Sequence, residues 1–132
     1  MKLKYVQVCI FITLFSILIL FTTPIFADEQ YKEWPSKNAY DENKAWVIKF
    51  NTIIDINTIF DNIYIVDSKE NKIKTTLSIE PNCKQAIIYP FFSYNYGEVY
   101  TLYIIKNIKS ESGKQLKESI KFTFPVIKRP EY

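Results

Sequence analysis

The fold predicted for this chain rests on the stretch YNYGEVYTLYIIKNIKSESGKQLKESIKFTF, which spans residues 94–124. Tyr, Leu and Ile occupy every second position of residues 100–104, just after a Gly-Glu turn. Ile and two Phe occupy every second position of residues 120–124, and a polar loop with glycine at 112–114 lies between the two runs. Two runs of period two joined by such a loop are typical of β-sandwich strands and not of a catalytic motif.

Short strand-like runs recur in the chain before this stretch. The predicted strands are residues 45–50, 63–66, 72–79, 85–89, 98–105 and 119–126. Asp55 is placed to cap one helical turn at 56–60, and turns are predicted at 68–71 and 81–84. The spacing favours an all-β, Ig-like sandwich of about seven antiparallel strands with Greek-key connections. We assign this domain to residues 44–127.

Alternation within the predicted strands identifies the core. The residues expected to build it are Trp46, Phe50, Tyr100, Leu102, Phe122 and Phe124. Tyr100 lies near the start of a late strand, where a tyrosine hydroxyl can turn back onto the preceding loop and form a tyrosine corner. The alternative is a core tyrosine whose hydroxyl simply reaches water.

The N-terminal segment has the features of a secretory signal. Lys2 and Lys4 precede an apolar run at residues 5–21, and Pro24 and Ala27 stand where a cleavage site requires them. We therefore predict a helical signal peptide at residues 1–27 that is cleaved after Ala27. The alternative is an uncleaved membrane anchor, since about twenty apolar residues just span a bilayer.

The segments on either side of the sandwich complete the domain assignment. Residues 28–43 are a polar lead-in, either flexible or a short edge strand, and 128–132 form a short tail.

The chain has 17 basic and 14 acidic residues, and removal of Lys2 and Lys4 with the signal leaves a net charge of +1. No basic stripe remains, so nucleic acid is not expected as a partner.

The composition argues against an enzyme and against a cofactor or metal. Without any histidine, the chain cannot form a Ser-His or Cys-His pair, and it lacks the usual zinc ligands. The carboxylate pair Asp55 and Asp61 suits loop capping better than acid–base catalysis. Calcium at Asp67, Glu70 and Asn71 is weighed against a solvated hairpin loop, which fits the short segment better.

Two cysteines occur, and only one of them belongs to the predicted mature chain. Cys9 lies within the apolar run of the signal, which leaves Cys83 without an internal disulfide partner. Cys83 is either a small, partly apolar residue of the turn at 81–84 or a thiol for an intermolecular bridge.

Residues 89–96 contain more aromatic side chains than a loop requires. Phe91, Phe92, Tyr94 and Tyr96 are the candidate contacts for a ligand or partner, and Trp34 is a further candidate at lower weight. Adjacent phenylalanines in an extended segment cannot easily both point inward, so at least one is expected on the surface. The alternative is structural, with Phe91 folded under the sandwich and Tyr94 closing its open end.

These motifs, taken in order, resemble the bacterial Ig-like domains found in S-layer proteins and other exported proteins of Gram-positive bacteria, clostridia especially. The matching pieces are WVIKFN at 46–51, IYIVD at 63–67, Tyr94 before Gly97 and Glu98, YTLYI at 100–104 and SESGKQLK at 110–117. The resemblance implies an Ig-like sandwich that serves as a spacer, stalk or adhesion module. It implies no catalytic residues.

We therefore expect an exported, non-enzymatic module with a structural or binding role, secreted or associated with the cell surface. One alternative is a module that binds carbohydrate or cell-wall polymer through residues 89–96. A second is a subunit that assembles with itself or with another surface protein through an edge strand. A protease inhibitor on the same scaffold is a third and weaker alternative.

Overall fold

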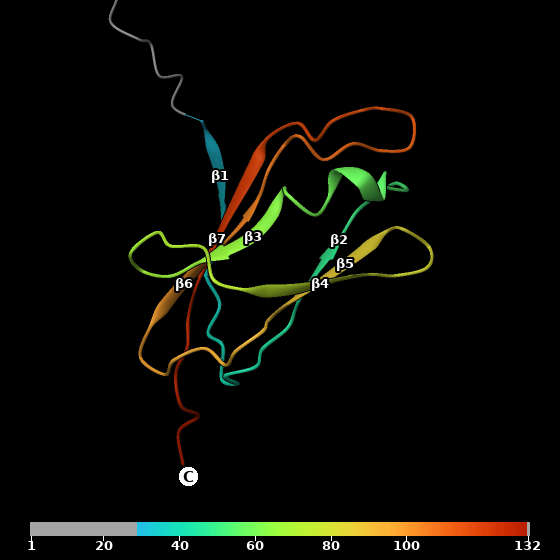
Figure 1. Ribbon diagram of the computed structural model, residues 1–132. Helices are drawn as coiled ribbons and strands as arrows, with labels where there is room; N and C mark the ends of the chain where they lie inside the picture. Colours follow the sequence, from blue (N-terminus) through green and yellow to red (C-terminus); the bar gives the residue numbers. More distant parts are fainter. Residues whose placement is uncertain (1–28, 132) are drawn as a thin grey trace, which may run out of the picture.

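Two sheets packed face to face make up the protein, whose computed structural model describes residues 29–131 (Figure 1). The strands are β1 (Tyr31–Trp34), β2 (Trp46–Lys49), β3 (Ile63–Val66), β4 (Thr75–Ile79), β5 (Gln85–Pro90), β6 (Val99–Ile104) and β7 (Ser119–Pro125). One sheet has the order β1-β7-β6-β3, and the other has the order β2-β5-β4. A single 3₁₀ turn, η1 (Ile56–Thr58), is the only helical element of the described residues. The predicted all-β sandwich is confirmed, whereas the predicted signal peptide lies outside the described residues.

One pairing departs from the predicted antiparallel arrangement. Strand β1 runs parallel to β7, with Tyr31 opposite Ser119 and Trp34 opposite Phe122. The polar lead-in thus contributes an edge strand to the larger sheet. All other strand pairs are antiparallel.

The predicted strand at 72–79 is shortened because the chain changes sheet at its beginning. Lys72 forms an isolated bridge with Val66 of β3, and the Ile73 amide donates to the Ile65 carbonyl. The Phe91 amide then donates to the Lys74 carbonyl, one residue before β4 pairs with β5. Residues 72–74 therefore cross from the larger sheet to the smaller one.

The core lies between the sheets, on the faces that the alternation indicated. Tyr100, Leu102, Phe122 and Phe124 are buried there. Trp46 is partly buried and packs its ring against those of Phe122 and Phe124, with centroids 4.8 and 4.9 Å away. Such edge-to-face and tilted contacts add to the stabilisation that burial provides. Phe50 packs at the margin of the same cluster.

Tyr100 also fixes the loop that precedes its strand. Its hydroxyl oxygen accepts a hydrogen bond of 3.0 Å from the backbone amide of Asn95, while its ring is buried in the core. This is the tyrosine-corner geometry. Gly97 completes the turn with φ of +85°, a conformation that glycine adopts without steric cost.

The chain enters and leaves the sandwich at opposite ends (Figure 1). The upper end, where β1 begins, carries the loops at 50–62, 80–84 and 105–118. The lower end, where β7 finishes, carries the loops at 35–45, 67–74 and 91–98. Within residues 29–131, no helix has the length and apolar character needed to cross a membrane.

Candidate functional site

The loop at 91–98, which carries Phe91, Phe92, Tyr94 and Tyr96, crosses the lower end and is anchored at several points. It continues β5, whose last residue is Pro90. The Tyr94 amide donates to the Glu42 carbonyl at 2.7 Å, and the Ser93 hydroxyl donates to Asn43 Oδ1 at 2.9 Å. These two bonds tie the loop to the segment that leads into β2. The loop is therefore held in place by its neighbours and not only by its own turns.

Phe91 and Phe92 form an exposed aromatic pair at this end, which we call the Phe pair. Phe91 is 53% exposed and Phe92 is 72% exposed. Their rings meet edge to face with centroids 4.9 Å apart, and the Lys74 ammonium lies 4.0 Å from the Phe91 centroid. A cation over one ring leaves Phe92 as the freer stacking surface. The pair therefore offers an apolar surface with a positive charge beside it.

Tyr94, a candidate contact residue in the sequence analysis, lies in the core and not on the surface. It is only 3% exposed, and its ring packs on Tyr100 and Phe124 with centroids 4.8 and 5.3 Å away. Its buried hydroxyl has no hydrogen-bond partner among the described residues. Burial raises the pKa of Tyr94 because the phenolate is less stable away from water. Tyr94 thus closes the end of the sandwich, as in the structural alternative given for it, and it is not available on the surface as a contact residue.

The remaining candidates lie apart from the Phe pair. Tyr96 is partly exposed beyond Tyr94 and has the Lys128 ammonium 5.8 Å from its ring centroid. Trp34 is on β1, at the side of the sandwich, and lines a separate cleft with Trp46. The five predicted contacts therefore do not form one site. Only Phe91 and Phe92 lie together on the surface.

Asp67, which was weighed for calcium, and Asp55, which was weighed for acid–base catalysis, each accept hydrogen bonds within their own loops. Asp67 Oδ1 accepts the amides of Lys69 and Asn71, each at 2.9 Å. The hydrogen bond from the Asn71 amide is the first cause of a lowered Asp67 pKa. Asp55 accepts the Asn57 amide at 3.0 Å and caps η1, as predicted. Across residues 29–131, no group of three or more His, Cys, Asp or Glu is placed to hold a metal ion.

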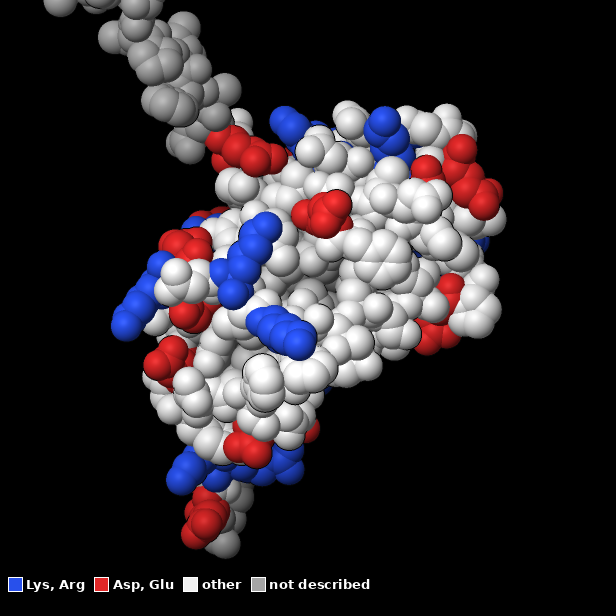
Figure 2. Space-filling model, in the orientation of Figure 1, with Lys and Arg blue, Asp and Glu red and all other residues white. Residues whose placement is uncertain are grey.

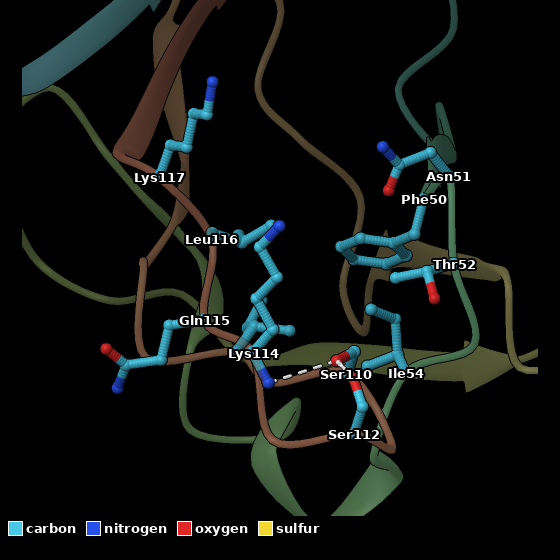
Figure 3. Close-up of a pocket in the computed structure, with 11 residues that line it drawn as sticks. Phe50, Asn51, Thr52, Ile54, Ser110, Ser112, Lys114, Gln115, Leu116 and Lys117 are labelled. Carbon is cyan, nitrogen blue, oxygen red and sulfur yellow. Dashed lines mark hydrogen bonds between the residues drawn. The ribbon is translucent and has the colours of Figure 1, made fainter.

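A pocket of about 570 Å³ opens at the upper end (Figure 3). Figure 3 shows Phe50 on one wall and Leu116 on the other. Ser110 and Ser112 share a hydrogen bond of 2.8 Å, and the Lys114 amide donates to Ser110 Oγ at 3.2 Å. The hydroxyls of Ser110 and Ser112 are therefore paired within the loop.

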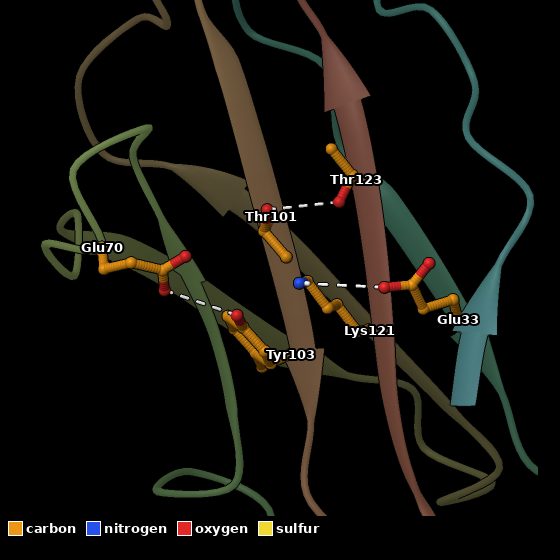
Figure 4. Close-up of polar contacts among 6 residues, drawn as sticks. All are labelled: Glu33, Glu70, Thr101, Tyr103, Lys121 and Thr123. Atoms are coloured by element: carbon orange, nitrogen blue, oxygen red, sulfur yellow. Dashed lines mark hydrogen bonds and ion pairs between the residues drawn. The ribbon is translucent and has the colours of Figure 1, made fainter. Parts of the chain in front are cut away.

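Tyr31, Tyr64 and Tyr103 lie together as one layer on the outer face of the larger sheet, and Figure 4 shows Tyr103 with its polar contact to Glu70. Tyr103 packs against Tyr31 and Tyr64 with centroids 5.2 and 5.4 Å away, and its hydroxyl donates to Glu70 Oε2 at 3.4 Å. Burial is the first cause that raises the pKa of each of these tyrosines. Burial, followed by the hydrogen bond to Glu29 and the negative charge of Glu29, raises the pKa of Tyr31 to about 12. The layer is internally paired, which favours a structural role.

Charge on the surface is mixed in sign. Figure 2 shows lysine and arginine interspersed with aspartate and glutamate over the face in view. The face in view therefore carries no basic stripe of the kind that binds nucleic acid.

Two features of the surface were not found from the sequence. Lys74 reaches the Phe pair because residues 72–74 change sheet, and no local motif indicates this crossing. Trp34 and Trp46 meet at one cleft because β1 and β2 belong to different sheets that come together there. Only the three-dimensional arrangement shows either feature.

Comparisons with known proteins agree with this architecture. A family model described as bacterial Ig-like domain matches residues 32–126. The crystal structure of the S-layer protein rSbsC(31-844) is similar with a TM-score of 0.53 and 20% identity, over 77% of this chain and 14% of that one. The N-terminal part of the bacterial S-layer protein SbsC gives a TM-score of 0.50 and 20% identity, over 73% of this chain and 24% of that one. The chain therefore spans only a small part of either protein. No curated protein sequence matches it.

Proposed function

Because this chain belongs to the bacterial Ig-like domain family, we propose that it is an exported, non-enzymatic structural module of the cell surface or the medium. The observation that carries this proposal is the placement of the terminal strands. β1 begins at the upper end, β7 finishes at the lower end, and the two pair in parallel over four residues. A module joined through its two ends would therefore act as a spacer.

This arrangement is suited to bearing load. A pull on the two ends draws β1 towards the upper end and β7 towards the lower end, so the hydrogen bonds between them are loaded in shear, all at once. Ion pairs cross the same seam, from Lys32 to Glu118 at 3.2 Å and from Lys121 to Glu33 at 3.9 Å. Each contributes little by itself because it is exposed. The parallel hydrogen bonds between β1 and β7 therefore supply most of the resistance to unfolding under force.

Single-molecule pulling on the protein from its two ends tests the spacer role. Lys32→Pro and Glu33→Pro each remove one amide from β1, and only one of two consecutive amides in an edge strand faces its neighbour. We expect one of these variants to lower the unfolding force markedly. Lys128→Pro, which lies beyond β7, is the matched control. Equal forces in all four proteins would remove the load-bearing role.

Export is tested separately in cells that produce the full chain. We expect the protein in the medium or the surface fraction, with an N-terminus at Asp28 if the signal is cleaved as predicted. Recovery from the membrane with the apolar segment intact would instead support the anchor alternative. Recovery from the cytoplasm would remove the proposal of export.

A second proposed role is binding of carbohydrate or cell-wall polymer, and the Phe pair supports it. An aromatic ring that is 72% exposed is unusual for a residue with only a structural role, and Phe92 is free to stack on a sugar ring. The Lys74 ammonium beside the Phe pair would favour an anionic polymer.

Co-sedimentation with purified cell wall tests this role. We expect Phe92→Ala to abolish sedimentation and Lys74→Ala to weaken it. Phe60→Ala is the matched control, because Phe60 is 59% exposed and lies at the other end of the sandwich. Unchanged sedimentation of Phe92→Ala would remove the second role and leave the spacer role standing.

A further inference from the structure

An apolar cleft of about 370 Å³ opens at the side of the sandwich, between the edges of the two sheets. We call it the Trp cleft. Its lining is apolar except for one lysine, and it consists of Trp34, Pro35, Lys37, Trp46, Val47, Ile48, Leu102 and Phe122. Leu102 and Phe122 belong to the buried core, so the cleft reaches the layer between the sheets. It is unrelated to the Phe pair.

The Trp cleft follows a strand edge that has no partner strand within residues 29–131. β2 pairs with β5 on one side only and is the edge strand of its sheet. Trp46, Val47 and Ile48 are consecutive and all line the cleft. Successive side chains of a strand point to opposite faces, so three consecutive residues share a cleft only if it runs along their backbone. The exposed backbone groups of β2 therefore border the Trp cleft.

Two further features show which chemistry fits there. Trp46 Nε1–H is buried and has no acceptor among the residues that the structure describes. Lys37 lines the cleft, and the Lys44 ammonium lies 5.4 Å from the Trp46 ring centroid. No carboxylate is part of the described lining. The site thus combines backbone groups, apolar walls, an unsatisfied donor and positive charge.

We propose that the free edge of β2 receives an extended acidic segment of a partner protein, which pairs as an additional strand and places apolar side chains in the Trp cleft. Main-chain hydrogen bonds supply the general affinity in this mode of recognition, and the inward side chains supply the selectivity. Carboxylates at the ends of the segment would lie near Lys37 and Lys44. An oxygen on an inward side chain would satisfy Trp46 Nε1–H.

A second copy of this chain fits the site less well. Two β2 edges brought together would also bring together Lys37 and Lys44 of both clefts and Lys49 at the end of each β2, and like charges in proximity are unfavourable. Charge at an edge strand is also a common protection against self-pairing. An acidic segment from a different protein has the complementary charge.

The two tryptophans of the chain both line the cleft and therefore report on it. The probe is the tryptophan-free peptide acetyl-Asp-Thr-Val-Thr-Leu-Thr-Asp-amide, whose Asp, Val and Leu side chains share one face when it is extended. We expect its addition to shift tryptophan emission to shorter wavelength and to slow amide hydrogen exchange in β2. The same peptide with lysine in place of both aspartates should bind about fivefold more weakly, as expected for loss of exposed charge pairs.

Variants locate the binding site. Trp34→Ala should abolish the added exchange protection with little loss of stability, because Trp34 is 42% exposed. Lys37→Glu should weaken binding about fivefold, whereas Lys84→Glu, at the upper end, should not change it. Absence of any emission shift at millimolar peptide, or a shift without protection of β2, would overturn the proposal. A molecular mass that rises with protein concentration in the absence of peptide, and that Lys37→Glu changes, would also overturn the proposal. It would assign the β2 edge to a second copy of this chain.

Discussion

Phe92 and Tyr94 lie two positions apart in one loop and have opposite environments. Phe92 is 72% exposed at the lower end, and Tyr94 is 3% exposed within the aromatic core. Both are large aromatic residues, so hydrophobicity does not separate them. The Glu42 carbonyl accepts the Tyr94 amide and fixes the backbone there, while the Tyr94 ring packs on those of Tyr100 and Phe124. Contacts with distant segments, and not the composition of the loop, therefore distinguish its buried aromatic residue from its exposed ones.

The two residues therefore contribute differently. The buried ring of Tyr94 adds packing with Tyr100 and Phe124, although its hydroxyl lacks a partner. Exposed Phe92 leaves much of its apolar surface in water and gains little from folding. Stability and binding are thus assigned to different residues of the same loop, and each assignment can be tested alone.

The largest expected effect is that of Tyr94→Ala. Removal of a buried aromatic ring leaves a cavity, and we expect the free energy of unfolding to fall by about 3 to 5 kcal/mol. Urea denaturation followed by circular dichroism measures the change. Tyr94→Phe is the control and should be neutral or stabilising, since it removes a buried hydroxyl that has no partner. A loss below about 1 kcal/mol in Tyr94→Ala would break the contrast with Phe92.

Tyr100→Phe should have the opposite sign to Tyr94→Phe. The Tyr100 hydroxyl accepts the Asn95 amide, and its removal leaves that amide without a partner. We expect a loss of about 1 to 2 kcal/mol in the same denaturation experiment. Two adjacent core tyrosines would then differ in the contribution of their hydroxyls alone. Equal stability of both phenylalanine variants would contradict the tyrosine corner as a stabilising contact.

Tyr94 also makes a testable contribution to alkaline stability. Its pKa is raised in the folded protein, whereas in the unfolded chain it is expected near 10. Below about pH 10 both states keep the proton and the stability is fully present. Above that pH the unfolded chain loses the proton first, so stability falls by at most about 1.4 kcal/mol per pH unit. Tyr94→Phe should flatten this decline, although Tyr31, Tyr64 and Tyr103 remain.

Much of the architecture could be predicted because strand alternation is local. The runs at 100–104 and 120–124 became β6 and β7, and Asp55 caps the helical turn as expected. The parallel pairing of β1 was missed because its residues are mostly exposed and polar and show no inward face. A strand held by an edge ladder and ion pairs has little hydrophobic pattern to detect.

The surface was less predictable than the fold. Five aromatic residues within positions 89–96 have no clear period, so the sequence could not decide which of them are buried. The approach of Lys74 to Phe91 and the meeting of Trp34 with Trp46 depend on contacts between distant segments. Such sites have no local signal, because topology and not spacing brings their residues together.

The smallest expected effect on stability is that of Phe92→Ala. Because its ring is mostly in water, we expect the free energy of unfolding to change by no more than about 0.5 kcal/mol. Parallel urea titrations of Phe92→Ala and Tyr94→Ala measure the contrast directly, and the native near-ultraviolet spectrum shows whether the core is intact. A loss comparable to that of Tyr94→Ala would show that Phe92 packs in solution. It would then be a second residue that closes the end of the sandwich, and the binding role of the Phe pair would lose its physical basis.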